Sequence, residues 1–328
     1  RGLGDVYKRQ GSPSVNSSGS CHFGLCGNVL DGFGGRSGES SRHHPKTSRN
    51  TTMNENEEKF QQFEREGWEE VADTYANLTE GVTSEVAGPL LDAAEVSSSS
   101  RLVDIATGPG WVAREAQARG AEVVGVDIAE AMLENARKRL PEVSFVHSSA
   151  EALQLPDASF DAAVSAFGMP HFADHTAFAR EAARVLRPGG KLAFASWYPP
   201  AINEFFAIAI GAISKYGTLE VDLPQGVDMF RWADQQACDE LLASAGLSSG
   251  MRRDVGLHYV TDRQGAGIVD FMRKASVRTR ALYEAQSEEA KQAIAAGLPE
   301  FLIPYQNGDV CRIPMQAFVV SATKPDAA

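Results

Sequence analysis

Residues 102–111 read LVDIATGPGW, and they constrain the fold more than any other part of the chain. An apolar run ends there in a glycine turn, and a helix-favouring run follows over residues 112–119. A second apolar run, over residues 122–126, ends in Asp127. This order predicts a β-α-β unit with a glycine corner and an acid at the tip of its second strand. Such units bind nucleosides, because the backbone approaches the ligand at the glycines and the carboxylate accepts hydrogen bonds from the ribose hydroxyls.

The composition limits the class of protein and its partners. The chain has 328 residues, 43% of them hydrophobic, which suffices for one large domain or two small ones. Its net charge of -12 disfavours nucleic acid as a partner. No apolar run approaches the roughly 20 residues of a membrane span. The few scattered cysteines predict no disulfide framework, which fits a reducing, cytoplasmic compartment. These cysteines are Cys21, Cys26, Cys238 and Cys311.

The first 52 residues differ from the rest of the chain. They are rich in Ser, Gly, Arg and Asn and lack apolar periodicity. We therefore expect residues 1–52 to be a disordered or non-native leader, with translation starting at Met53. The alternative is an organelle transit peptide, which would change the predicted compartment. Cys21 and Cys26 lack the usual zinc spacing, and no metal site is predicted.

The remaining chain begins with helices and then alternates. Residues 54–78 predict helix, and a second helix is expected over residues 84–94, where Pro89 marks a boundary or kink. Strands and helices then alternate up to residue 197, which predicts an α/β protein whose parallel sheet carries helices on both faces. The strands are expected at 102–106, 122–126, 143–146, 160–166 and 191–197. The helices between them are expected at 111–119, 130–140 and 176–186.

After residue 198 the alternation breaks. An apolar and aromatic stretch over residues 199–231 contains a predicted helix. Residues 187–190 (RPGG) are expected to close the preceding helix and start strand five. Further helices are expected at 205–213 and 234–245, with one or two more within 265–296, and further strands at 251–260 and 312–322.

The glycine turn suits two kinds of nucleoside ligand. Residues 108–113 satisfy the pattern G-x-G-x-x-[GA], and Asp127 lies 19 residues past Gly108, as in dinucleotide-binding dehydrogenases. Asp104, inside the first strand, favours a ligand with an ammonium group over one with a pyrophosphate. No Tyr-x-x-x-Lys pattern lies near strand five. Asp127 could instead cap the helix that follows it.

Four motifs in one order carry a family resemblance. With these motifs the chain resembles the class I S-adenosylmethionine-dependent methyltransferases of the small-molecule type, which include the quinone-biosynthesis C-methyltransferases. The motifs are VDIATGPG at 103–110, VGVDI at 124–128, AEALQLPDASFD at 150–161 and RVLRPGGKL at 184–192. The match is good over roughly residues 60–200 and loose elsewhere.

The resemblance implies a fold and a division of the chain. We expect a doubly wound, mostly parallel seven-stranded sheet, the Rossmann-like methyltransferase fold, with helical lid insertions. Residues 101–328 would form the methyltransferase domain, with lid inserts at about 199–232 and 263–298. Residues 53–100 would supply N-terminal helices of the acceptor pocket.

The resemblance also implies a site for S-adenosylmethionine. Asp104 and the backbone near Gly108 would hold the methionine end, Asp127 would accept from both ribose hydroxyls, and Ile128 would pack on the adenine. Ser149 stands where the family often has Asp, so Glu151 could supply the adenine amino contact. The implied cofactor-binding residues are Tyr75, Asp104, Ala106, Thr107, Gly108, Gly110, Asp127, Ile128, Ser149, Ala150, Glu151 and Phe167.

Methyl transfer from a sulfonium is an in-line displacement that needs no metal and no covalent intermediate. His171 is the candidate base or acceptor-orienting residue. The insert after strand five is strongly apolar, which predicts a small apolar or aromatic methyl acceptor, or else merely a packed lid. Its apolar residues are Trp197, Tyr198, Phe205, Phe206, Ile210, Met229, Phe230 and Trp232.

Two other functions remain open at this stage. One is a nicotinamide-dependent oxidoreductase, and the other is a non-catalytic S-adenosylmethionine-binding protein. The [Asn/Asp]-Pro-Pro-[Tyr/Phe] motif of enzymes that methylate nucleic-acid amino groups is absent, because residues 166–169 read AFGM. The acceptor, the methylated atom and the oligomeric state are not determined by the sequence.

Overall fold

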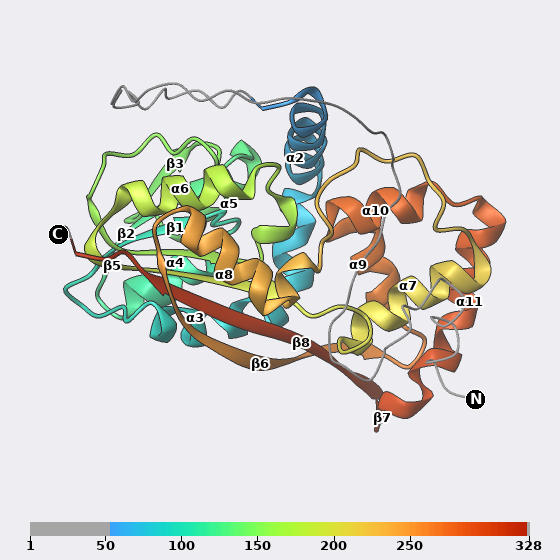
Figure 1. Ribbon diagram of the computed structural model, residues 1–328. Coiled ribbons are helices and arrows are strands. Elements are labelled where there is room, and N and C mark those ends of the chain that lie inside the picture. Colours follow the sequence, from blue (N-terminus) through green and yellow to red (C-terminus); the bar gives the residue numbers. More distant parts are fainter. Residues whose placement is uncertain (1–52, 327–328) are drawn as a thin grey trace, which may run out of the picture. The chain divides into compact units, whose positions relative to one another are not determined.

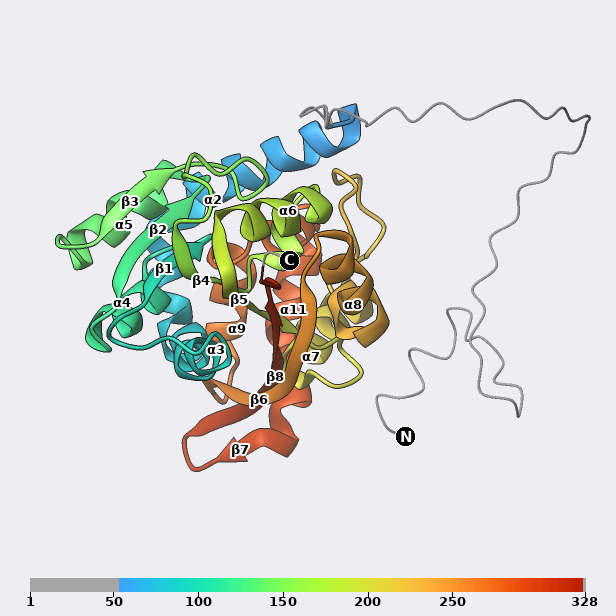
Figure 2. The ribbon, with the colours of Figure 1, turned by 60° about the vertical axis from the view of Figure 1, so that its left-hand side comes forward.

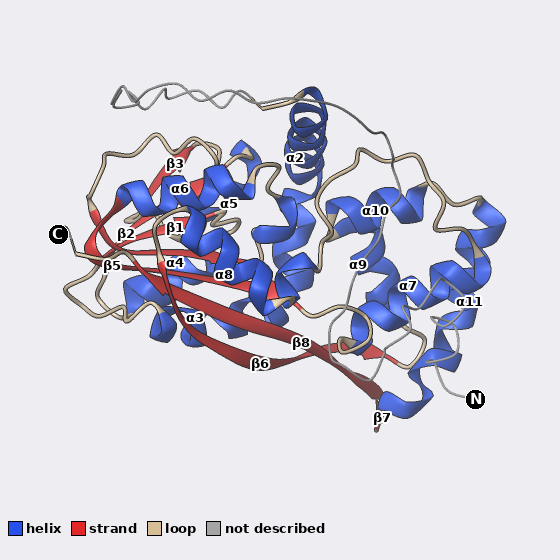
Figure 3. Ribbon diagram, viewed as in Figure 1, coloured by secondary structure: helices blue, strands red, loops and turns tan. Residues whose placement is uncertain are grey.

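The computed structural model describes residues 53–326, and in this part of the chain an eight-stranded sheet carries helices on both faces (Figure 3). The predicted leader, with Cys21 and Cys26, lies outside the described residues. Cys238 and Cys311 are buried and unpaired. No helix within the described range is both long and apolar enough to cross a bilayer.

The observed strand directions confirm the prediction of a mostly parallel sheet. Its strands run in the order β3-β2-β1-β4-β5-β8-β6, and the first five of these are parallel. Strand β8 is antiparallel to both β5 and β6, and a short β7, which the sequence did not predict, pairs with β8. The bounds are β1 (Arg101–Ile105), β2 (Glu122–Asp127), β3 (Ser144–His147), β4 (Phe160–Ala166), β5 (Leu186–Trp197), β6 (Ser248–Asp262), β7 (Gln306–Asn307) and β8 (Val310–Thr323). The strand order reverses between β1 and β4, and in such sheets ligands bind at the carboxyl ends of the strands at this point.

Side chains alternate between the two faces of the sheet and build two cores. One face packs Leu102 and Val164 against α3 and α4, whereas the other packs Val103 and Phe194 against α6 and α8. Helix α5 lies beside β2 and β3. The bounds are α3 (Ala87–Ala93), α4 (Trp111–Ala118), α5 (Glu130–Arg139), α6 (His175–Val185) and α8 (Gln235–Ser244).

One long helix, α2 (Glu55–Thr83), covers the first helix predicted at the start of the chain and runs five residues past its expected end. A capping box starts it: the Asn54 side chain accepts from the backbone N–H of Glu57, and the Glu57 carboxylate accepts from the backbone N–H of Asn54. A short 3₁₀ turn, η1 (Ser84–Val86), separates α2 from α3. Pro89 is the third residue of α3, where its missing N–H costs no helical hydrogen bond. The boundary lies instead before Ala87, where the 3₁₀ turn passes into α3.

A second helical group lies at one end of the long strands β6 and β8 (Figures 1 and 2). It contains α7 (Glu204–Tyr216), α9 (Ala266–Lys274), α10 (Val277–Glu284) and α11 (Glu288–Leu302). The expectation of one or two helices over residues 265–296 was wrong, because Ser276 and Ser287 are N-cap residues that divide the segment into three. Strand β5 starts at Leu186 rather than Lys191, so residues 187–190 belong to the strand. The remaining 3₁₀ turns are η2 (Met169–His171), η3 (Arg231–Ala233) and η4 (Ile303–Tyr305).

The glycine turn after β1 needs left-handed backbone. Gly108 has φ 52° and Gly110 has φ 87°. A Cβ atom added at Gly110 would lie 3.0 Å from Cδ1 of Leu140, at the end of α5. Gly110 therefore serves the close packing of α4 against α5.

The change Gly110→Ala is expected to lower the free energy of unfolding by about 1–2 kcal/mol, because it adds left-handed strain and crowds Leu140. Urea unfolding measures this loss. Gly246→Ala is the matched control, since Gly246 has φ 74° but no atom within 4 Å of an added Cβ. Equal losses in both variants would show that the Leu140 contact adds nothing.

Candidate functional site

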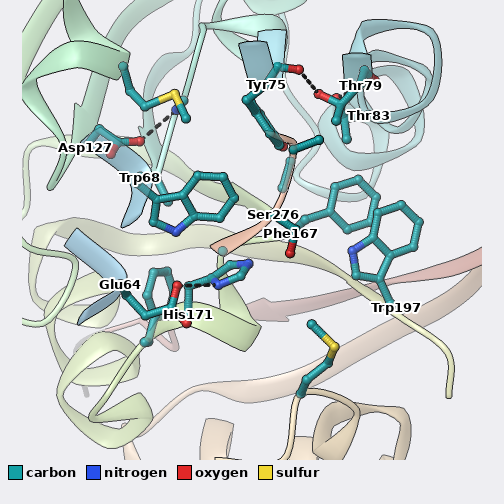
Figure 4. Close-up of a pocket in the computed structure, with 18 of the residues that line it drawn as sticks. Glu64, Trp68, Tyr75, Thr79, Thr83, Asp127, Phe167, His171, Trp197 and Ser276 are labelled. Atoms are coloured by element: carbon teal, nitrogen blue, oxygen red, sulfur yellow. Dashed lines mark hydrogen bonds and ion pairs between the residues drawn. The ribbon is translucent and has the colours of Figure 1, made fainter. Parts of the chain in front are cut away.

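A cavity opens at the carboxyl ends of β1, β2 and β4, bounded by α2 and by the second helical group (Figure 4). It holds about 1160 Å³ of empty space, its open mouth included.

The cavity wall contains most of the predicted site residues. They are Tyr75, Ala106, Gly108, Asp127, Ile128, Ala150, Glu151, Phe167 and His171. Four predicted residues are not in the wall: Asp104, Thr107, Gly110 and Ser149. The neighbouring Ser148 lines the cavity where Ser149 was expected to.

Asp127 ends β2 with its carboxylate in the wall. Its Oδ2 accepts from the backbone N–H of Gly108 at 2.8 Å, and its Oδ1 accepts from that of Ala129 at 3.0 Å. Burial raises the pKa of Asp127 to about 6, against these two hydrogen bonds, which lower it. A carboxylate has about four lone-pair sites, so both oxygens can still accept from ligand hydroxyls.

The alternative role of Asp127, as the cap of the next helix, is wrong. The first free N–H groups of α5 belong to Glu130 and Ala131, and both donate to the Glu69 carboxylate of α2, at 2.7 and 2.9 Å. Helix α2 thus supplies the N-terminal cap of α5 from another part of the chain. This leaves the Asp127 carboxylate directed at the glycine turn and the cavity.

Asp104 lies beneath the glycine turn and is almost fully buried. Its Oδ2 accepts from the Thr107 hydroxyl at 2.6 Å and from the backbone N–H of Ala113 at 3.2 Å. Its Oδ1 is buried and has no hydrogen-bond partner among residues 53–326. Burial raises the pKa of Asp104 to about 7, because the charged form lacks full solvation. An unpaired buried carboxylate oxygen of this kind is suited to a cationic ligand group.

Two non-glycine residues with left-handed backbone lie at neighbouring strand ends. Ala106 follows β1 with φ 57°, and Phe167 follows β4 with φ 61°. The Phe167 ring stacks on Trp197 at the end of β5, with ring centroids 3.8 Å apart and an interplanar angle of 5°. A left-handed backbone is energetically unfavourable for residues other than glycine, and it is retained where the surrounding packing enforces it, often at ligand sites. Here they place the Ala106 backbone and the Phe167 ring in the cavity wall.

One face of α2 contributes polar and aromatic side chains to the wall. These are Gln61, Glu64, Trp68, Tyr75, Thr79 and Thr83. Burial raises the pKa of Tyr75 to about 12, so its hydroxyl stays neutral. Glu64 was not predicted from the sequence, although it sits between the buried Phe60 and Gly67 on the packed face of the helix. A single acid among apolar helix positions is the signal that could have found it.

The loop after β3 is tied to α2 through Glu151. Its carboxylate accepts from Gln61 Nε2 at 2.8 Å, from the backbone N–H of Ala173 at 2.8 Å, and from the Ser149 hydroxyl. The Glu151 side chain is therefore already held by protein donors. The expected contact of this carboxylate with an adenine amino group stays a prediction.

The far part of the cavity is apolar. Of the predicted apolar insert, Trp197, Phe206 and Met229 are in the wall, joined there by Tyr259, Phe271 and Met315 from β6, α9 and β8. The other insert residues are not in the wall; Tyr198, for instance, donates to Asp254. The insert is thus divided, with some residues lining the cavity and others packing elsewhere, and its role toward a methyl acceptor stays a prediction.

The chain matches a family model described as a methyltransferase domain over residues 103–194. It is 36% identical over 176 residues to the demethylmenaquinone methyltransferase of Thermus thermophilus, a match covering 48% of this chain and 79% of that relative. It is 42% identical over 117 residues to the demethylmenaquinone methyltransferase of Deinococcus radiodurans, covering 34% of this chain and 48% of that relative.

A solved structure shares the fold. It is the complex between the Trm112 methyltransferase activator of Haloferax volcanii and a methyltransferase, with a TM-score of 0.50, 18% identity, and coverage of 80% of this chain and 98% of that one. The identity is low, so this likeness speaks for the fold alone. The Thermus relative and the domain match together show that the chain belongs to the class I S-adenosylmethionine-dependent methyltransferases.

Proposed function

We propose that the protein transfers the methyl group of S-adenosylmethionine to a small apolar or aromatic molecule. The observation that supports this most is the makeup of the cavity. One part is formed by the glycine turn and Asp127, and it continues into an apolar part that contains Trp197 and Phe206. A nucleoside and an apolar acceptor would therefore meet within one cavity.

The residues present fit the cofactor. Asp127 would accept hydrogen bonds from the ribose hydroxyls, and Ile128 would pack against the adenine. The unpartnered Oδ1 of Asp104 suits the ammonium of the methionine end. Asp104 is not part of the cavity wall, so the ammonium would have to approach its carboxylate at the glycine turn. In this proposal Gly110 has a packing role and does not contact the cofactor.

When bound, S-adenosylmethionine supplies a methyl group on a positively charged sulfur. The chain's own part is to hold the acceptor in line with that methyl and to keep water out. The stacked rings of Phe167 and Trp197 form a flat apolar wall at the strand ends. Helix α2 covers the opening with Trp68 and Tyr75.

The acceptor class is inferred from the apolar lining and from relatives. Curated relatives are named demethylmenaquinone methyltransferases, so an apolar ring system is the acceptor we propose. The segments at about 199–232 and 263–298 would act as lids over it, and residues 53–100 as part of its pocket. A cytoplasmic location without nucleic-acid partners remains part of this proposal.

Calorimetry with S-adenosylhomocysteine and with NAD tests the cofactor. We expect binding of the first and none of the second, because Asp104 disfavours a pyrophosphate at the glycine turn. Binding of NAD alone would instead favour the oxidoreductase alternative. Release of S-adenosylhomocysteine is then measured with a panel of apolar ring compounds. Cofactor binding without turnover of any acceptor would favour a non-catalytic binding protein.

A further inference from the structure

A buried carboxylate and an imidazole meet in the cavity wall. Nδ1 of His171, in η2, lies 2.9 Å from Oε2 of Glu64, in α2 (Figure 4). The two side chains are 17% and 3% exposed. Glu64 is thus almost fully buried, and its carboxylate contacts the imidazole of His171 within the wall.

An ionised Glu64 carboxylate only accepts, so the contact with it requires the hydrogen on Nδ1 of His171 and leaves a lone pair on Nε2 of the neutral ring. Nε2 makes no hydrogen bond with any residue in the described range 53–326. The ring is held edge-on against Trp68, with centroids 4.9 Å apart and an interplanar angle of 89°. The backbone N–H of His171 donates to the carbonyl of Gly168 and fixes the segment.

The Glu64 carboxylate lies beside the position where positive charge would develop on His171. Oε1 of Glu64 is buried and has no partner among the described residues. A buried carboxylate with only part of its hydrogen bonds made is stabilised by a positive charge beside it. An imidazolium formed at His171 would therefore be stabilised by a group that is already in place.

We propose that Glu64 and His171 form a proton-accepting dyad, and that the methyl acceptor carries an ionisable hydroxyl, phenolic or enolic, on its apolar ring. The inference rests on the proposed function. In this dyad His171 would be the catalytic residue, because it lines the cavity and would contact the acceptor, and Glu64 would be a positioning residue. The wall near His171 is otherwise mainly aromatic, with Trp68 and Phe172, which suits a hydroxylated ring.

In methylation at the acceptor's oxygen, its O–H bond breaks and the proton moves to Nε2 of His171. The electron pair left on the oxygen forms the bond to the methyl carbon, while the bond from that carbon to sulfur breaks and its pair stays on sulfur. For methylation at the ring carbon of an enolic acceptor, the oxygen pair forms a carbonyl, the pair of the adjacent ring double bond forms the bond to the methyl carbon, and loss of that carbon's proton to solvent restores the enol. The imidazolium then loses its proton to solvent.

The test uses His171→Gln and Glu64→Gln with two phenols, one neutral and one already ionised at the assay pH. His171→Gln is expected to lower kcat for the neutral phenol by about 100-fold or more. The ionised phenol should restore most of that rate, because it needs no base. His258→Gln is the matched control, since His258 is not in the wall. Equal losses on both phenols, or no loss at all, would overturn the dyad.

Two readouts separate this inference from the proposed function. Calorimetry should give both variants an S-adenosylhomocysteine affinity within about twofold of the wild-type value. If the wild-type protein itself does not bind S-adenosylhomocysteine, the proposed function is wrong, and this result is distinct from a failure of the dyad. ¹⁵N NMR of the wild type should show the Nδ1–H tautomer of His171, and Glu64→Gln should lose that preference. An Nε2–H tautomer in the wild type would overturn the dyad. A wild type that binds the cofactor product but methylates neither phenol would overturn the acceptor class.

Discussion

The variant Asp127→Asn is expected to bind S-adenosylhomocysteine about 10- to 100-fold more weakly than the wild type. Its carboxylate is placed to accept from two ribose hydroxyls while its oxygens hold the N–H groups of Gly108 and Ala129. Asn keeps the shape but turns one acceptor into a donor and removes the charge. Hydrogen bonds to charged groups contribute about 1.5–3 kcal/mol, which corresponds to this loss of affinity. Isothermal calorimetry at pH 8 measures it.

The matched control is Asp92→Asn. Asp92 ends α3 and pairs with Arg119 on the surface, and it is not in the cavity wall. The affinity of the Asp92→Asn variant for S-adenosylhomocysteine should equal that of the wild type. Urea unfolding of both variants would show whether a weaker affinity reflects the site or a damaged fold. If folded Asp127→Asn protein bound the ligand as tightly as the wild type, the ribose would have to lie elsewhere.

The sequence predicted the first half of the sheet well, because its physical signals are local. The apolar run of β1, the glycine turn and the acid at the end of β2 lie within 26 residues of one another, between Leu102 and Asp127. Parallel strands then bring the turn and the acid to one edge of the sheet. Asp127, Ile128 and Phe167 accordingly appear in the cavity wall, as expected.

The contacts that the sequence did not reveal join distant parts of the chain. Glu69 caps α5 from 61 positions away, and Glu64 meets His171 across 107 positions. No local pattern encodes either pairing, since each depends on how α2 lies across the sheet. Gly110 and Ser149 make contacts that their motif positions did not predict: Gly110 packs close to Leu140, and the Ser149 hydroxyl donates to Glu151. Their contact with a ligand stays a prediction.

Asp104 and Asp127 show how a ligand site can oppose the stability of the fold. Both are buried, and burial is the largest cause that raises the pKa of each, to about 7 for Asp104 and about 6 for Asp127, from 3.8. The folded chain therefore binds more protons than the unfolded chain between about pH 4 and pH 7. Stability rises with pH where the unfolded state binds more protons, so here the contribution of these two acids falls as the pH rises. At neutral pH, the empty protein holds carboxylates that its fold disfavours.

The affinity for S-adenosylhomocysteine is therefore expected to rise with pH, by about 10- to 100-fold between pH 5 and pH 8. Ligand hydroxyl and ammonium groups pair best with ionised carboxylates, and each acid must lose its proton in this range before it can do so. Calorimetry across this range measures the rise, and thermal unfolding of the empty protein should show the opposite trend.

The variant Asp104→Asn separates the two acids. It keeps an acceptor for the Thr107 hydroxyl and for the N–H of Ala113, but it removes the carboxylate that titrates nearest neutral pH. In this variant the rise of affinity between pH 6 and pH 8 should flatten, and the rise below pH 6 should become shallower, because only Asp127 then titrates there. Any titration of the ligand itself would persist unchanged and is thereby distinguished. An affinity that is flat from pH 5 to pH 8 in the wild type would mean that neither buried acid pairs with the ligand as an anion, and the assignment of both ends of the cofactor would have to be abandoned.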